Sequence, residues 1–323
     1  MPAEDLNLYP WLQGAAARLA AARAAGRLPP AVLIHAAPGV GAMALVRYFA
    51  QLRFCTAELV PCGRCSHCRR VAAGEHPDLA IVGPDIESKL GQISVEQVRE
   101  LSAQLALSSY EGRGTVVALD PADALNRNAA NALLKTLEEP RADAHLILLA
   151  TTPSLLPATV RSRCQVLAVA APERSAALAW LEERQPAHRA AWPAVLDVLG
   201  VAPLEALEAD VPHVLAIRED VRRLLAEARR GRIDVIREAE NWAKDELPLR
   251  LRGIENSLAA ELLSTGAGAG AGATAGLDAA ATLRLLDELR ELRRQLAGAA
   301  LNRPLALERQ FWRLDSAGAR QSR

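Results

Sequence analysis

Four of the five cysteines in this 323-residue chain lie close together, at Cys55, Cys62, Cys65 and Cys68. Two cysteines separated by two residues can place both sulfur atoms on one tetrahedral Zn²⁺ ion, with Zn–S distances near ~2.3 Å. Four thiolates would leave no coordination position for water, so the metal would be structural. The spacing therefore predicts Zn²⁺ as a cofactor. Cysteines without metal and an iron–sulfur cluster are the alternatives, and we expect the nearby His67 and His76 to be bystanders.

A pair of arginines, Arg161 and Arg163, offers a second kind of chemistry. They lie between two apolar runs, residues 145–150 and 165–169, that we predict to be strands. On a tight strand-to-strand connection, these side chains would project outward. A guanidinium is permanently charged and presents a planar fork of donors, which suits a phosphate group at a junction between subunits.

A glycine-rich turn resembles a phosphate-binding loop but lacks its functional side chains. Residues 31–35 read as a buried strand, and a turn with Gly39 and Gly41 leads into a helical pattern, the context that such a loop needs. A working loop continues with Lys and then Ser or Thr, whereas this chain has Ala42 and Met43. We therefore interpret the segment as a degenerate phosphate loop without a functional ATP site. The alternative interpretation is an ordinary turn between a strand and a helix.

A second nucleotide motif is also incomplete. Residues 115–120 read as a buried strand that ends in Asp120, where an ATPase would hold Mg²⁺ and polarise water with the following Glu. Here Pro121 follows, and proline cannot act as a base. We therefore expect Asp120 to be a helix-capping acid and the chain to have no catalytic residue of its own.

The elements that position these residues alternate between strands and helices up to residue 169. Residues 79–82 read as a strand, and Ser94 with Gln97 forms a capping-box pattern at the start of a helix. Residues 126–139 read as a helix whose leucines face a core. The charged residues near its end read as a solvated face: Lys135, Glu138 and Glu139.

The second half of the chain has a different pattern. From Pro172 onward it reads as helices with short breaks and without a convincing strand. Residues 266–276 are almost all Gly and Ala, which predicts a flexible linker or a long loop. Leucines between residues 285 and 296 form a helical seam that suits packing within the chain or against a partner.

Composition limits the function classes. Lys and Arg together number 38, as do Asp and Glu, and aromatic residues make up only 3%, which argues against nucleic-acid binding as the main role. The chain starts without a signal-peptide pattern, and its apolar runs are shorter than the ~20 residues of a membrane helix. We therefore expect a cytoplasmic protein that does not bind membranes.

Several motifs together resemble the delta prime subunits of bacterial DNA polymerase III, in the clamp-loader branch of the AAA+ proteins. The resemblance covers the whole chain and rests on the four-cysteine insert, residues 9–12, residues 131–140, the triplet Ser162-Arg163-Cys164 and residues 301–305. The two incomplete nucleotide motifs distinguish the chain from the ATP-hydrolysing gamma/tau subunits.

The resemblance implies an α/β AAA+ (P-loop-like) module with a five-stranded parallel sheet, followed by a helical lid and an all-α collar. The corresponding domains would be residues 1–169, with the zinc-binding insert at 55–68, then 170–210 and 211–323. The collar would assemble subunits into a ring of five.

The resemblance also implies a mechanism. Arg163 would enter the ATP site of an adjacent gamma/tau subunit as an arginine finger, and Ser162 and Cys164 would hold it in position. The implied partners are gamma/tau and delta subunits, the sliding clamp, and primer-template DNA through the complex. An active clamp-loader ATPase and a zinc-dependent DNA-binding module are the competing functions.

Overall fold

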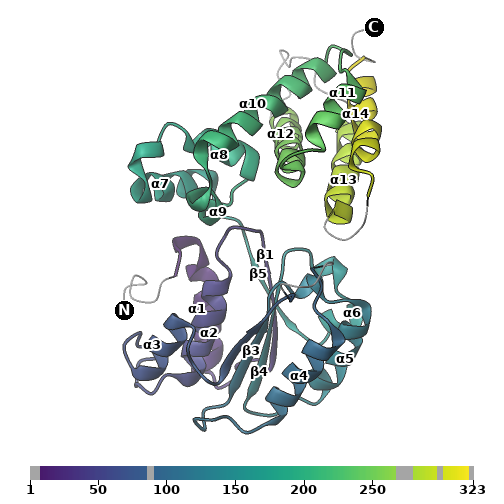
Figure 1. The fold of residues 1–323 in the computed structure, drawn as a ribbon. Coiled ribbons are helices and arrows are strands. Elements are labelled where there is room, and N and C mark those ends of the chain that lie inside the picture. The colour runs from purple at the N-terminus through teal and green to yellow at the C-terminus, as the bar shows by residue number, and fades with distance from the viewer. Residues whose placement is uncertain (1–7, 86–90, 267–278, 297–300, 320–323) are drawn as a thin grey trace. The chain divides into compact units, whose positions relative to one another are not determined.

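The computed structural model describes residues 8–85, 91–266, 279–296 and 301–319. The chain forms two compact units, Met1–Pro172 and Glu173–Arg323, the first α/β and the second helical (Figure 1). The further division of the second unit at residue 210 stays a prediction. Residues 267–276 of the Gly/Ala tract lie outside the described residues.

The first unit is built on a five-stranded sheet in the order β2-β3-β4-β1-β5, and every pair of neighbouring strands is parallel. The fold class implied by the resemblance is thereby confirmed. The strands are β1 (Ala31–Ala36), β2 (Leu79–Val82), β3 (Thr115–Leu119), β4 (Ala144–Ala150) and β5 (Gln165–Val169).

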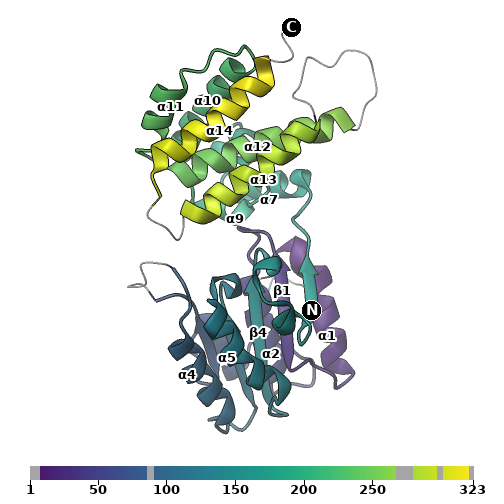
Figure 2. The same ribbon diagram turned by 90° about the vertical axis from the view of Figure 1, so that its right-hand side faces the viewer.

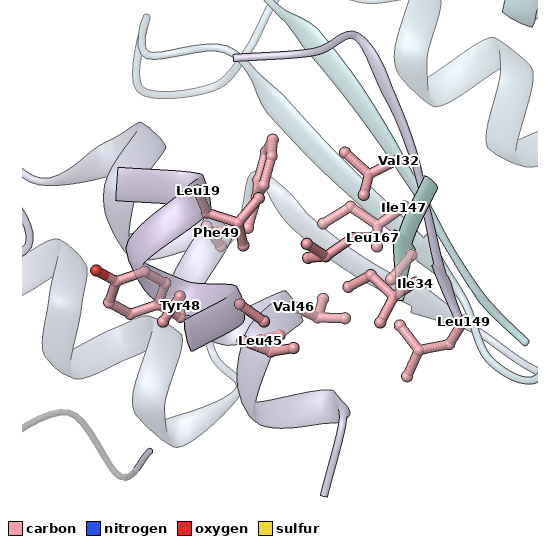
Figure 3. Close-up of a cluster of buried hydrophobic side chains, with 14 of the residues drawn as sticks. Leu19, Val32, Ile34, Leu45, Val46, Tyr48, Phe49, Ile147, Leu149 and Leu167 are labelled. Atoms are coloured by element: carbon pink, nitrogen blue, oxygen red, sulfur yellow. The ribbon is translucent and has the colours of Figure 1, made fainter. Parts of the chain in front are cut away.

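Helices cover both faces of this sheet (Figure 2). One core contains residues from α1 (Gln13–Ala24), α2 (Met43–Phe54) and α3 (Ser66–Ala73). The other contains residues from α4 (Val95–Ala106), α5 (Arg127–Glu138) and the short α6 (Ala158–Arg161). Successive strand residues point to opposite faces, so Val32 and Ile34 enter the first core (Figure 3). Leu33, between them, enters the second core. Burial on both faces explains why the central strands β1, β3 and β4 are mostly apolar, whereas the edge strands β2 and β5 are more exposed.

Local signals place the helices that matter for function. Ser94 accepts a hydrogen bond from the backbone N–H of Gln97, and the Gln97 side chain accepts one from the backbone N–H of Ser94, so the predicted capping box at the start of α4 is confirmed. Asn126 caps α5 through the backbone N–H of Ala129, at 2.8 Å. Leu133 is fully buried on the inner side of α5.

The connection that carries the arginines is longer than expected. We predicted a tight strand-to-strand connection, but β1 lies between β4 and β5 in the sheet. Parallel strands require a crossover, and residues 151–164 supply it with a 3₁₀ turn, η4 (Pro153–Leu155), and then α6. Arg161 is therefore the last residue of a short helix, and Arg163 lies in the turn between that helix and β5.

The second unit contains helices and no strand among its described residues, as expected. Buried aromatic side chains at its core include Trp192, Trp242 and Phe311. Leu289 of the leucine seam is fully buried in this unit, where its helix contacts two neighbouring helices of the same chain. The elements are α7 (Arg174–Arg184), η5 (Pro186–His188), α8 (Trp192–Leu199), α9 (Pro203–Glu208), α10 (Val211–Ala228), α11 (Val235–Trp242), α12 (Leu247–Gly266), α13 (Ala279–Leu296) and α14 (Arg303–Ala319).

Ion pairs also join the helices of the second unit. Arg293 on α13 donates to both carboxylate oxygens of the buried Glu255 on α12, at 3.0 and 3.1 Å. Arg252 on α12 donates to both oxygens of Glu205 on α9, at 2.7 and 2.8 Å. Among the described residues, each helix is too short or too polar to cross a membrane.

Candidate functional site

The four clustered cysteines lie where α2 ends and α3 begins. Cys55 follows the last residue of α2, Cys65 is the N-cap of α3, and Cys68 lies in its first turn. With Cys62 from the intervening loop, their four Sγ atoms all lie within 4.8 Å of one another, and those of Cys55 and Cys65 are 4.0 Å apart. Tetrahedral Zn–S bonds of ~2.3 Å would separate two sulfur atoms by about 3.8 Å. A disulfide needs ~2.05 Å, so the cluster fits a four-coordinate metal better than disulfides.

Backbone N–H groups prepare this cluster for negative charge. Each of the last three cysteines donates its N–H to the sulfur of the preceding cysteine, at 3.4, 3.3 and 3.4 Å. Burial raises the pKa of the Cys55 and Cys68 thiols. Burial also acts to raise the pKa of Cys65, but the N–H of Cys68 and other donors outweigh it and bring this pKa to about 6. A bound divalent cation would stabilise all four thiolates, so the donor set fits Zn²⁺.

A second group of metal-type ligands lies beside the cysteines but is better explained by hydrogen bonds. His67 Nδ1 lies 3.0 Å and His76 Nε2 lies 3.4 Å from Glu111 Oε2. The N–H of Asp78 donates to His76 Nδ1, so the neutral ring carries its proton on Nε2, the atom that would face a metal. Burial lowers the pKa of His76 and keeps it neutral. Arg70 also contacts both oxygens of Glu111, at 2.7 Å each, so this cluster anchors α3 to the loop before β3.

The incomplete phosphate loop keeps its backbone shape but not its charge. Gly39 and Gly41 have positive φ angles of 71° and 76°. Val40 between them is fully buried, and its carbonyl accepts a hydrogen bond of 2.8 Å from the Trp11 indole N–H. At the positions that need Lys and Ser or Thr, Ala42 and Met43 pack partly buried against the core. The loop therefore offers a phosphate neither a cation nor a metal-binding hydroxyl.

Asp120 does not have the capping role that we expected. The 3₁₀ turn that follows, η3 (Ala122–Ala124), has Pro121 as its N-cap residue and has no side-chain cap. Asp123 is the acid that organises this region, since its Oδ2 accepts the backbone N–H groups of Thr151 and Thr152 at 3.1 and 2.8 Å. Burial raises the pKa of Asp120, and the nearby Asp123 adds to the shift.

Arg163 is partly exposed and makes its contacts within its own unit. Its Nη2 lies 2.7 Å from Glu138 Oε1 at the end of α5, and its Nη1 donates to the Thr159 carbonyl at 2.9 Å. We predicted that Glu138 belongs to a solvated face. Glu138 is exposed as predicted, but it also pairs with Arg163. The sequence around Glu138 could not predict this pair, because Arg163 is 25 residues away in the chain.

The neighbours of Arg163 stabilise its short helix. The Ser162 hydroxyl donates to the Thr159 carbonyl at 3.2 Å, and the Cys164 thiol donates to the Val160 carbonyl at 3.4 Å. Burial raises the pKa of Cys164 to about 11, so this thiol stays protonated. Arg161 is exposed, and its side chain makes no hydrogen bond or ion pair to the described residues, whereas its backbone N–H donates to the Pro157 carbonyl at 3.1 Å.

Sheet topology separates Arg163 from the phosphate loop of its own chain. Strands β1 and β5 run parallel, with Val32 opposite Gln165 and Ala36 opposite Val169. Arg163 precedes β5, whereas the loop follows β1. The two therefore lie at opposite ends of these neighbouring parallel strands. At ~3.3 Å per residue, the intervening strand spans roughly 17 Å.

Comparison with known proteins identifies the family. The family model described as DNA polymerase III, delta subunit, matches residues 12–173. DNA polymerase III subunit delta' of Pseudomonas aeruginosa is 36% identical over 248 residues, which cover 75% of this chain and 74% of that protein. The subunit delta' of Yersinia pestis is 35% identical over 272 residues, which cover 82% of this chain and 79% of that protein.

A lesser similarity extends to a related subunit. DNA polymerase III subunit tau of Salmonella typhimurium is 36% identical over 141 residues, which cover 43% of this chain and 21% of that protein. The matches to the subunits delta' of Pseudomonas aeruginosa and Yersinia pestis extend over much more of both chains. This chain therefore belongs to the family of delta prime subunits of bacterial DNA polymerase III.

Proposed function

We propose that this chain is a non-hydrolysing clamp-loader subunit, a scaffold that donates Arg163 to the ATP site of a neighbouring gamma/tau subunit. It assembles in the cytoplasm with gamma/tau and delta subunits, and the complex loads the sliding clamp on primed DNA. In this proposal, residues 170–210 form the lid and residues 211–323 form the collar that joins the subunits.

The observation that carries the proposal is a mismatch of charge within one unit. The loop that would hold ATP phosphates presents Ala42 and Met43, and both pack against the core. Arg163, by contrast, is partly exposed at the opposite end of the parallel strands, too far to contact a phosphate bound at the loop of its own chain. A permanently charged fork of donors in that position suits the phosphates of an adjacent subunit.

The test is the ATPase activity of a reconstituted clamp loader. We expect Arg163→Ala to lower the hydrolysis stimulated by DNA and clamp, because arginine fingers are worth on the order of 10³–10⁵ in rate at the site they serve. Arg161→Ala is the matched control and should leave the rate unchanged, since Arg161 is also exposed, as the last residue of α6, but lies outside the Ser162-Arg163-Cys164 triplet. Unchanged hydrolysis in Arg163→Ala, or brisk ATP cleavage by the isolated chain, would contradict the proposal.

We also infer that the four clustered cysteines hold a structural Zn²⁺. The mutual Sγ distances, the N–H donors to sulfur and the complete set of four thiolates support this assignment. The ion would fix the loop between α2 and α3 without taking part in the chemistry.

A further inference from the structure

We propose that Glu138 is a positioning residue for Arg163, and that it holds the guanidinium back on its own subunit until the phosphates of the neighbour's nucleotide displace it. This inference rests on the proposed role of Arg163 in the adjacent ATP site. It assigns a function to the acidic end of α5, which the proposed mechanism otherwise does not use.

The contacts of Arg163 describe a folded-back side chain. Its Nη2 lies 2.7 Å from Glu138 Oε1, and its Nη1 donates at 2.9 Å to the carbonyl of Thr159, four residues earlier on α6. Both terminal nitrogens are therefore bonded within the same subunit, and one bond returns to α6, the helix that Arg163 follows. An arginine that reaches into another subunit has to give up at least one of these bonds.

The pair with Glu138 is suited to being replaced. The side chain of Glu138 is 51% exposed and that of Arg163 is 36% exposed, so water screens their attraction. A nucleoside triphosphate carries several negative charges and can accept two hydrogen bonds from one guanidinium. It therefore competes well against a single exposed carboxylate, and the pair sets only a modest barrier to deployment.

This arrangement predicts a change in apparent affinity rather than in maximal rate. The apparent affinity of the adjacent site for ATP equals its intrinsic affinity multiplied by the fraction of Arg163 that is free to reach that site. Glu138→Gln removes the charge and keeps the size, so it should lower the ATP concentration that gives half-maximal stimulated hydrolysis. Because exposed ion pairs are weak, we expect this ATP concentration to fall by a factor of about 1.4 to 5. The maximal rate should not change.

Two matched variants make the test specific to this pair. Glu139→Gln changes the next carboxylate on the same exposed surface, which has no ion pair to a described residue, and should cause no shift. In the double variant Glu138→Gln with Arg163→Ala, the effect of Glu138→Gln should disappear, because its only proposed target is gone. A general structural defect would persist in that background.

The outcomes separate this inference from the function on which it rests. A higher half-saturating ATP concentration, a lower maximal rate or no change in Glu138→Gln overturns the inference, provided that Arg163→Ala impairs the loader. If Arg163→Ala has no effect, the proposed function itself fails. A lower half-saturating concentration that depends on Arg163 supports both.

Discussion

Counting reactive thiols tests the proposed metal site in detail. In the metal-loaded protein at pH 8, a chromogenic disulfide reagent should find no rapidly reacting thiol, because the metal protects four cysteines and the fold shields Cys164. A strong chelator should release four reactive thiols, because removing the ion frees the loop between α2 and α3 and opens Cys55 and Cys68, whose burial otherwise raises their pKa, to solvent. Unfolding in denaturant should then expose the fifth.

The slow reaction of Cys164 follows from its surroundings. Its pKa of about 11 leaves roughly 0.1% of the thiol ionised at pH 8, compared with roughly 24% for a free cysteine of pKa ~8.5. The thiolate is the nucleophile, but a more basic thiolate also attacks a disulfide faster, which offsets roughly tenfold of this difference, so Cys164 should react roughly 20-fold more slowly than an unperturbed cysteine. This difference in rate is large enough to distinguish Cys164, which denaturant exposes, from the four thiols that the chelator releases.

Substitutions link the thiol count to the metal. Cys68 is fully buried in the first turn of α3, and Cys68→Ser should reduce bound zinc to less than half an equivalent. Cys164→Ser is the control and should retain about one equivalent, since this residue lies outside the cluster. The reasoning is refuted if five thiols react before chelation, or if the parent protein binds less than half an equivalent after refolding with zinc in reductant.

Two further predictions concern the stability of the first unit. Gly114→Ala should destabilise it by more than Gly112→Ala, because both glycines have positive φ angles, of 86° and 68°, but only at Gly114 does an added Cβ come within 2.1 Å of the Asp143 carbonyl oxygen. Both variants carry the strain of a left-handed backbone, which costs roughly 1–2 kcal/mol, so the difference between them measures the clash with the Asp143 carbonyl. Hydrogen exchange of the β3 amides would measure the loss of stability in each variant. Equal losses in the two variants would contradict the geometry. Burial lowers the pKa of His145 below its ordinary ~6.5, so its neutral form stabilises the fold above that pH and this contribution is lost as pH falls through the lowered pKa. The free energy of unfolding should therefore fall below pH ~6.5 by at most ~1.4 kcal/mol per pH unit for this residue, and His145→Asn, which can still donate to the Pro29 carbonyl, should flatten that slope; an unchanged slope would count against the assignment.

Local signals in the sequence were sufficient for most of the first unit. The apolar runs of β1 and β4 predicted buried strands, and both strands are almost entirely buried, whereas the parallel arrangement was implied by the resemblance alone. Ser94 and Gln97 marked the start of α4 because a capping box is formed by residues three apart. The cysteine spacing predicted a cluster for the same reason, since most of its geometry is decided within one loop.

Interactions between distant residues were beyond the reach of such signals. The pairs Glu138 with Arg163 and Arg70 with Glu111 join residues that only the folded sheet brings together. The crossover before β5 was predicted to be a tight turn because sequence order does not reveal that β1 lies between β4 and β5. Asp120 was assigned a capping role that a short 3₁₀ turn beginning after proline does not need.

The bond between Trp11 and Val40 also provides an optical probe of the first unit. The sequence has five tryptophans, and the other four follow residue 172: Trp180, Trp192, Trp242 and Trp312. Replacing those four by Phe would leave Trp11 as the single source of tryptophan fluorescence. Because its indole is tied to the buried centre of the loop, its emission wavelength would register any rearrangement there as the subunits come together, without an attached dye.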